Sequence, residues 1–134
     1  MRLLACLLLC LAARPAAAEP SLAGTWFGQG QPDNKESMYL DHMLPNGQIH
    51  SQFRTCRKGK AYDSTEDGTW SVAGNILTIR VALHDSIPMP RTDTYRLVSV
   101  TARQFKDVYL PLNFPYEERR VDDKFTMPGC ELVG

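Results

Sequence analysis

Residues 67–84 read DGTWSVAGNILTIRVALH, and the turn dipeptide Gly74-Asn75 lies at the centre of this stretch. Glycine and asparagine together are typical of the tight turn between two antiparallel strands, and apolar residues alternate with polar ones on both sides of it. A reversal at this dipeptide brings one apolar series face to face: Gly68 with Val81, Trp70 with Ile79 and Val72 with Leu77. The other face pairs Ser71 with Thr78 and Thr69 with Arg80. The stretch therefore predicts a hairpin with one buried face.

A second hairpin is predicted around Asn46-Gly47, because both central residues of a two-residue type I′ turn need positive φ. This turn gives one largely apolar face: Pro45 opposite Gln48, Leu44 opposite Ile49, His42 opposite Ser51, Leu40 opposite Phe53 and Met38 opposite Thr55. The mostly polar face pairs Met43 with His50, Asp41 with Gln52, Tyr39 with Arg54 and Ser37 with Cys56. In this register His42 and Ser51 form a polar pair on the buried face.

The rest of the chain continues as short alternating segments between turn residues, without a sustained helical period. Eight strands are expected, at 22–29, 37–44, 48–57, 67–73, 76–84, 92–100, 104–110 and 117–126. Consecutive antiparallel strands with one buried face must close on themselves or pack against another layer. The prediction is an all-β, eight-stranded antiparallel up-and-down barrel, and the alternative is a two-sheet β-sandwich.

The N-terminus has the three parts of a secretory signal peptide. Arg2 is followed by an apolar run over 3–13 and by the small residues Ala16-Ala17-Ala18. Cleavage is expected after Ala18, so residues 1–18 are the signal peptide and residues 19–134 are one barrel domain. The expected location is periplasmic or secreted.

The charge balance excludes some classes of partner. The sequence has 15 lysines and arginines against 15 aspartates and glutamates, and the signal segment removes Arg2 and Arg14 without any acid. The remaining chain is slightly acidic, which argues against a nucleic-acid footprint. No later stretch is apolar over the ~20 residues of a transmembrane helix, so the mature chain is expected to have no such segment.

Two of the four cysteines, Cys6 and Cys10, fall in the signal segment. The remaining pair, Cys56 and Cys130, is expected to form a disulfide in an exported protein. Cys56 falls on the outer face of the second hairpin, where a C-terminal tail carrying Cys130 could cross the barrel wall. A reactive thiol pair and two metal ligands are the alternatives, but neither a CxxC motif nor a histidine cluster accompanies these cysteines.

Gly24-Thr25-Trp26 on the first strand, followed by the hairpin meander, resembles the lipocalin-like members of the calycin superfamily, particularly small bacterial exported domains. The resemblance implies a barrel closed at one end by Trp26, with an arginine of a late strand on the face of its ring. Arg119 is the candidate for that arginine, and the contact would be a cation–π interaction.

An interior of this kind suits a small ligand, because apolar walls with a few placed polar groups are typical of binding sites. The candidate lumen residues are His42, Ser51, Phe53, Trp70, Ile79 and Tyr95. A metal site is not expected, since His42 and His50 fall on opposite faces in the predicted register and His84 lies on another hairpin. The chain shows no cofactor motif and no residue that can be assigned as catalytic.

Three hypotheses follow for function. The first is an exported lipocalin-like protein that binds a small apolar or amphipathic ligand. The second is a cell-envelope protein-interaction or inhibitor module with a filled core, which would use the apolar, proline-containing segments 88–91 and 111–116 to contact a protein partner. The third is an enzyme on a calycin-like barrel, which the sequence favours least and which would require a shifted pKa at His42 or Asp123.

Overall fold

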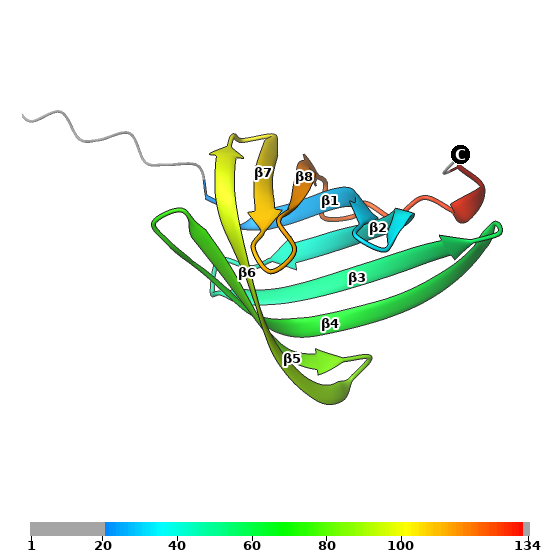
Figure 1. Ribbon diagram of the computed structural model, residues 1–134, viewed down its shortest axis with the longest axis horizontal. Coiled ribbons are helices and arrows are strands. Elements are labelled where there is room, and N and C mark those ends of the chain that lie inside the picture. The colour runs from blue at the N-terminus through cyan, green and yellow to red at the C-terminus, as the bar shows by residue number, and fades with distance from the viewer. Residues whose placement is uncertain (1–20, 133–134) are drawn as a thin grey trace, which may run out of the picture.

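The computed structural model describes residues 21–132 (Figure 1), so the predicted signal peptide lies outside the described residues. Eight strands follow one another: β1 (Gly24–Gln31), β2 (Asn34–Met43), β3 (Gln48–Arg57), β4 (Lys60–Ala73), β5 (Ile76–His84), β6 (Ile87–Val100), β7 (Gln104–Tyr109) and β8 (Phe114–Val121). A short 3-10 helix, η1 (Cys130–Leu132), follows them. None of the helical structure described is long and apolar enough to cross a membrane.

The strands pair in sequence order and close into a barrel. Closure is made by β1 against β8, with Thr25 opposite Val121 and Phe27 opposite Arg119. The predicted up-and-down barrel is confirmed, and the two-sheet sandwich is excluded. The bounds of four strands differ most from those expected: β2, β4 and β6 begin earlier, at Asn34, Lys60 and Ile87, and β8 runs from 114 to 121 rather than from 117 to 126. Residues 88–91 are therefore part of β6.

The hairpin over 67–84 has the predicted register. Gly68 pairs with Val81, Trp70 with Ile79 and Val72 with Leu77. Gly74 has a φ of 60°, as the turn requires. Turn chemistry and apolar alternation agree in this stretch, and both predict the observed pairing.

The predicted register of the other hairpin is wrong by one residue. Asp41 pairs with Ser51, and His42 pairs with His50. The turn has three residues, Pro45 to Gly47, because the amide of Leu44 donates to the carbonyl of Gln48 at 2.8 Å and that of Gly47 donates to Leu44 at 3.0 Å. Pro45 has no N–H to pair with Gln48, and its fixed φ suits a type I turn followed by a glycine in the left-handed region.

This shift exchanges the two faces of β2. His42 points outward instead of into the lumen, while Tyr39, Asp41 and Met43 line the interior. Met38 and Leu40, predicted to point inward, lie on the outer face and are nevertheless only 1% exposed. Segments outside the barrel wall therefore bury part of its outer surface.

One end of the barrel is closed by Trp26, which is fully buried. Its ring meets Phe105 edge to face at 4.7 Å between centroids, and its Nε1 donates to the carbonyl of Leu22 at 2.8 Å. The cation over Trp26 is Arg120, whose Cζ lies 4.2 Å from the ring centroid. The assignment of this role to Arg119 was wrong, because Arg119 points outward over the ring of Phe27 at 5.0 Å.

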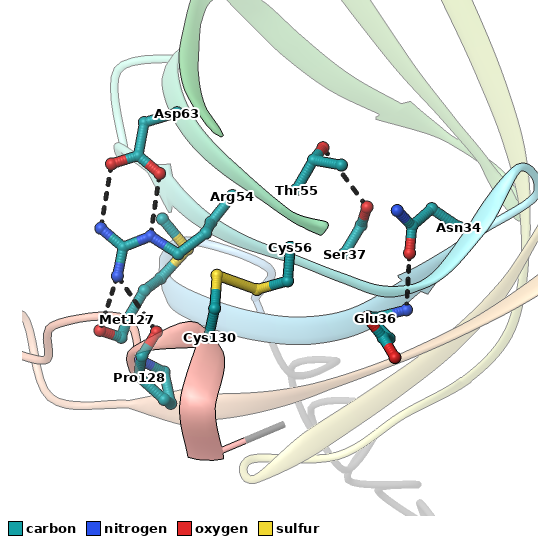
Figure 2. Close-up of a disulfide and its surroundings, with 10 residues drawn as sticks. All are labelled: Asn34, Glu36, Ser37, Arg54, Thr55, Cys56, Asp63, Met127, Pro128 and Cys130. Carbon is teal, nitrogen blue, oxygen red and sulfur yellow. Dashed lines mark hydrogen bonds and ion pairs between the residues drawn. A yellow bond between two sulfur atoms is a disulfide. The ribbon is translucent and has the colours of Figure 1, made fainter. Parts of the chain in front are cut away.

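A C-terminal tail, residues 122–132, crosses the outside of the wall beyond β8 and ends at the Cys56–Cys130 disulfide (Figure 2). Met38 packs beneath the tail with both cysteines and Met127. Arg54 holds Asp63 with two hydrogen bonds and donates to the carbonyl of Pro128 at 3.1 Å. The predicted disulfide and its position on the outer wall are thus confirmed.

Candidate ligand-binding site in the barrel lumen

The lumen contains a cavity of about 220 Å³ that residues of all eight strands line. The strand pairing arranges its lining in three levels. An apolar floor lies next to Trp26, carboxyl groups lie above the floor, and aromatic rings lie nearer the opposite end. A concave space with apolar walls and a few polar groups has the make-up of a small-molecule site.

The floor is formed by Met43, Ile49, Leu77 and Phe105, all of which pack in one cluster with Trp26. Trp70 packs against the same cluster, and its Nε1 donates to the carbonyl of Leu44 at 3.0 Å. The lumen therefore has one sealed end, and the cavity lies between this end and the turns at 32–33, 85–86 and 110–113.

Three carboxyl groups lie directly above the floor: Asp41, Asp107 and Glu118. Asp107 is next to Phe105 on the inner face of β7, and Glu118 is opposite Phe105 on β8. The Ser51 hydroxyl donates to Asp41 at 2.5 Å, and the Tyr39 hydroxyl donates to Glu118 at 2.8 Å. Exposure to solvent is only 2% for Asp107 and 4% for Glu118.

Burial changes the acidity of all three groups. It raises the pKa of Asp41 to about 6, an effect that the hydrogen bond from Ser51 opposes and the charge of Glu66 reinforces. Burial also raises the pKa of Asp107, and the charge of Asp41 raises it further. Burial raises the pKa of Glu118 as well; the charge of Asp107 reinforces this shift, and the hydrogen bond from Tyr39 opposes it. Burial therefore shifts the titration of these carboxyl groups to higher pH.

Four tyrosines form the aromatic level. The rings of Tyr39 and Tyr116 meet edge to face at 5.7 Å between centroids, Tyr116 lies 6.2 Å from Tyr95, and Tyr95 lies 5.2 Å from Tyr109. Burial, followed by the nearby carboxylates, raises the pKa of these phenols, so they stay neutral. They present ring faces and hydroxyl groups to the same cavity.

The other charged groups of the lining are paired. Arg91, which is partly exposed, donates to both carboxylate oxygens of Glu66 at 3.0 and 2.8 Å and to Asp93 at 2.9 Å. Tyr109 donates to the second oxygen of Asp93 at 3.2 Å. Asp67 lies 2.6 Å from Nδ1 of His50. The cavity is therefore acidic, and its one arginine already has two carboxylate partners.

The structure places four of the six candidate lumen residues on the cavity wall: Ser51, Phe53, Ile79 and Tyr95. Trp70 lies at the sealed end instead, and His42 lies outside the barrel. The sequence did not reveal these carboxyl groups, because the predicted register puts Asp41 on the outer face and the predicted contact of Arg119 with Trp26 turns Glu118 outward. For β7 no inner face is predicted. The sequence holds one indication of their position, because residues two apart in a strand share a face: Asp107 is two positions after the apolar Phe105, and Glu118 is two positions after Tyr116.

On the outer face His42 and His50 are direct neighbours, with ring centroids 6.2 Å apart, contrary to the predicted register. Thr25 donates to Asp123 at 2.6 Å and lies 3.2 Å from Nδ1 of His42. Burial and the neighbouring His50 lower the pKa of His42, while Asp123 opposes this shift. Within residues 21–132 no group of three or more potential ligand side chains is arranged to hold a metal ion.

Comparison with models of protein families and with curated proteins found no match to this chain.

Proposed function

We propose that the protein is an exported, lipocalin-like binding protein that takes one small amphipathic molecule into its lumen. The observation that carries the proposal is the cavity of about 220 Å³ with its apolar floor, carboxyl groups and tyrosines. An eight-stranded barrel has an interior able to hold one small ligand. Export is supported by the disulfide together with the signal-like N-terminal sequence.

The volume limits the size of the ligand. A cavity of about 150 Å³ is known to hold benzene, so this one suits roughly nine non-hydrogen atoms. A single aromatic ring with a short polar side chain has that size. A long acyl chain or a multi-ring compound would project from the unsealed end.

The alternative of a protein-interaction module receives support from exposed apolar side chains near the unsealed end. Ile87, Met89, Leu110 and Leu112 are between 42% and 63% exposed. That hypothesis called for a filled core, however, and the lumen is hollow. The cavity therefore favours the binding of a small molecule. The four exposed apolar residues give the unsealed end an apolar rim.

Native mass spectrometry of protein purified without refolding would look for a bound ligand. NMR titration with three small probes, 2-phenylethanol, 2-phenylethylamine and phenylacetate, would then test the lumen directly. We expect saturable shifts at lumen residues for at least one probe. The variant Ile79→Trp fills the cavity and should abolish them, while Arg80→Trp, whose side chain points outward from the same strand, should not. Absence of any adduct and of saturable binding by all three probes would contradict the proposal.

A further inference from the structure

Three carboxyl groups in one cavity have no cationic partner. Among the described residues no ion pair joins Asp41, Asp107 or Glu118 to a lysine, arginine or histidine, whereas Glu66, Asp67 and Asp93 each have one. The three groups also influence one another electrostatically. Carboxyl groups are seldom buried together unless a positive charge compensates them.

Two oxygen atoms of these three carboxyl groups also lack hydrogen bonds. Oδ1 of Asp107 and Oε2 of Glu118 are buried without a partner. The two residues lie on adjacent strands, with Asp107 opposite Tyr116 and Glu118 opposite Phe105, so their side chains are diagonal neighbours on the inner face. An unsatisfied buried acceptor is costly, and a donor placed in the cavity would remove that cost.

The aromatic level favours the same kind of partner. The electron-rich faces of tyrosine rings attract cations, and four such rings are in contact beside the carboxyl groups. Arg91 does not serve as the counter-ion of the three acids, because its guanidinium is already held by Glu66 and Asp93. An anionic ligand would meet carboxyl groups in this lining and would find its arginine already paired.

We propose that the natural ligand is a small organic cation, a protonated amine with an aromatic or short apolar body, whose ammonium group binds Asp107 and Glu118. This inference rests on the proposed binding function and specifies its ligand class. Ammonium N–H groups donate to the two unpartnered oxygens, and the tyrosine rings surround the body of the ligand. A metal ion is a poor occupant, since the space is much larger than an ion and no metal-binding cluster is present among residues 21–132.

Binding of a cation should be linked to pH. The groups facing Asp107 are Asp41 and Tyr39 on β2, Tyr95 on β6, and Tyr116 and Glu118 on β8. None of these groups is basic, so the carboxyl groups keep their protons to a higher pH than usual, and a bound ammonium would displace those protons. Amine binding should therefore release protons and weaken as the pH falls from 8 to 5.

The test compares three probes of similar size on the full chain: 2-phenylethylamine, the neutral 2-phenylethanol and the anionic phenylacetate. Calorimetric or NMR titration should give the amine a Kd at least about tenfold lower than that of the alcohol, with phenylacetate weakest. Asp107→Asn and Glu118→Gln should each bring the amine and the alcohol within about threefold of each other. Glu117→Gln is the matched control, because Glu117 is adjacent in β8 and exposed.

The outcomes separate the two proposals. If the alcohol binds as tightly as the amine, or if Asp107→Asn and Glu118→Gln both keep the preference, the cation proposal fails while the binding function stands. If no probe binds, both fail. Should a variant not fold, as judged by circular dichroism, the Kd values of the amine and the alcohol on the unmodified protein still test the cation proposal.

Discussion

The phenol of Tyr39 reaches across β1 to Glu118 on β8, donating a hydrogen bond of 2.8 Å. The strand between them has no side chain at the crossing point, because Gly28 pairs with both Tyr39 and Glu118. A Cβ at Gly28 would lie 2.2 Å from the Tyr39 ring. The glycine therefore permits a polar link between strands that are not neighbours, and this link fixes one of the acids of the lumen.

The variant Gly28→Ala should destabilise the protein by about 1–3 kcal/mol, since the added methyl must displace a buried ring. In a Tyr39→Leu background, where no ring crosses the strand, the same substitution should cost much less. Urea denaturation of the four proteins measures the difference. Equal costs in both backgrounds would mean that the crossing is unimportant.

The stability of the ligand-free protein should rise as the pH falls from about 7 to about 4. Asp41 has a folded-state pKa of about 6 against an ordinary value of 3.8, and burial also raises those of Asp107 and Glu118. Groups with raised pKa bind more protons folded than unfolded, so their contribution is present at low pH and is lost as pH rises through the folded pKa. His42, with its lowered pKa, acts in the opposite direction below pH 6.5.

Thermal melts across this range check the prediction. Asp107→Asn should flatten the profile, because an amide does not titrate. A profile that falls steadily on acidification in both proteins would argue against neutral carboxyl groups in the lumen.

Arg120 and its neighbour Arg119 should contribute very differently to the free energy of unfolding. The guanidinium of Arg120 covers Trp26 and donates to the carbonyls of Ala102 at 2.7 Å and Ala23 at 2.9 Å. Arg120→Lys loses the planar fork and leaves acceptors unpaired, so it should lower the free energy of unfolding by about 2 kcal/mol. Arg119→Lys, at an exposed position, should cost less than about 1 kcal/mol. Chemical denaturation followed by tryptophan fluorescence distinguishes them.

The register error on β2 has two physical causes. Met38 and Leu40 read as the buried face because they are apolar, and they are indeed buried, but under segments outside the barrel. Asp41 read as solvent-facing because it is polar, yet it lines the cavity. Because the lumen has polar groups and the outer wall of β2 is covered, the usual pattern of apolar residues inside and polar residues outside is reversed on this strand. In the hairpin at 67–84 the cavity-lining residues between Gly68 and Val81 are all apolar or glycine, and there the alternation and the turn predicted the pairing correctly.

The same two causes explain how much of the site could be predicted. Ser51, Phe53 and Ile79 lie on β3 and β5, whose inner faces are largely apolar, whereas Tyr95 shares the inner face of β6 with the charged residues Arg91 and Asp93. The acids could not be identified from pattern alone, because a buried carboxyl group contradicts the rule by which an inner face is recognised. Such local conflicts are expected at functional sites.

Removal of the disulfide should lower stability without changing the barrel. The cysteines are separated by 74 positions, and closing a loop of that length contributes about 4 kcal/mol in the chain-entropy model. The double variant Cys56→Ser/Cys130→Ser should unfold at a lower urea concentration than the parent. Its far-ultraviolet circular dichroism should remain that of a β-barrel, and loss of that spectrum would mean that the tail is needed for the fold itself.

The position of the tail also affects how the barrel can open. Strands β1 and β2 fill the arc between β8 and β3, and the tail spans that same arc before its covalent bond to β3. The barrel wall is thus held closed in two ways: by the hydrogen bonds between β1 and β8, and by the disulfide that joins the tail to β3. If the hydrogen bonds between β1 and β8 break, the disulfide still keeps these two strands near each other. They then pair again at the high effective concentration of a tethered pair. The tail therefore limits how far the barrel wall can separate at this seam.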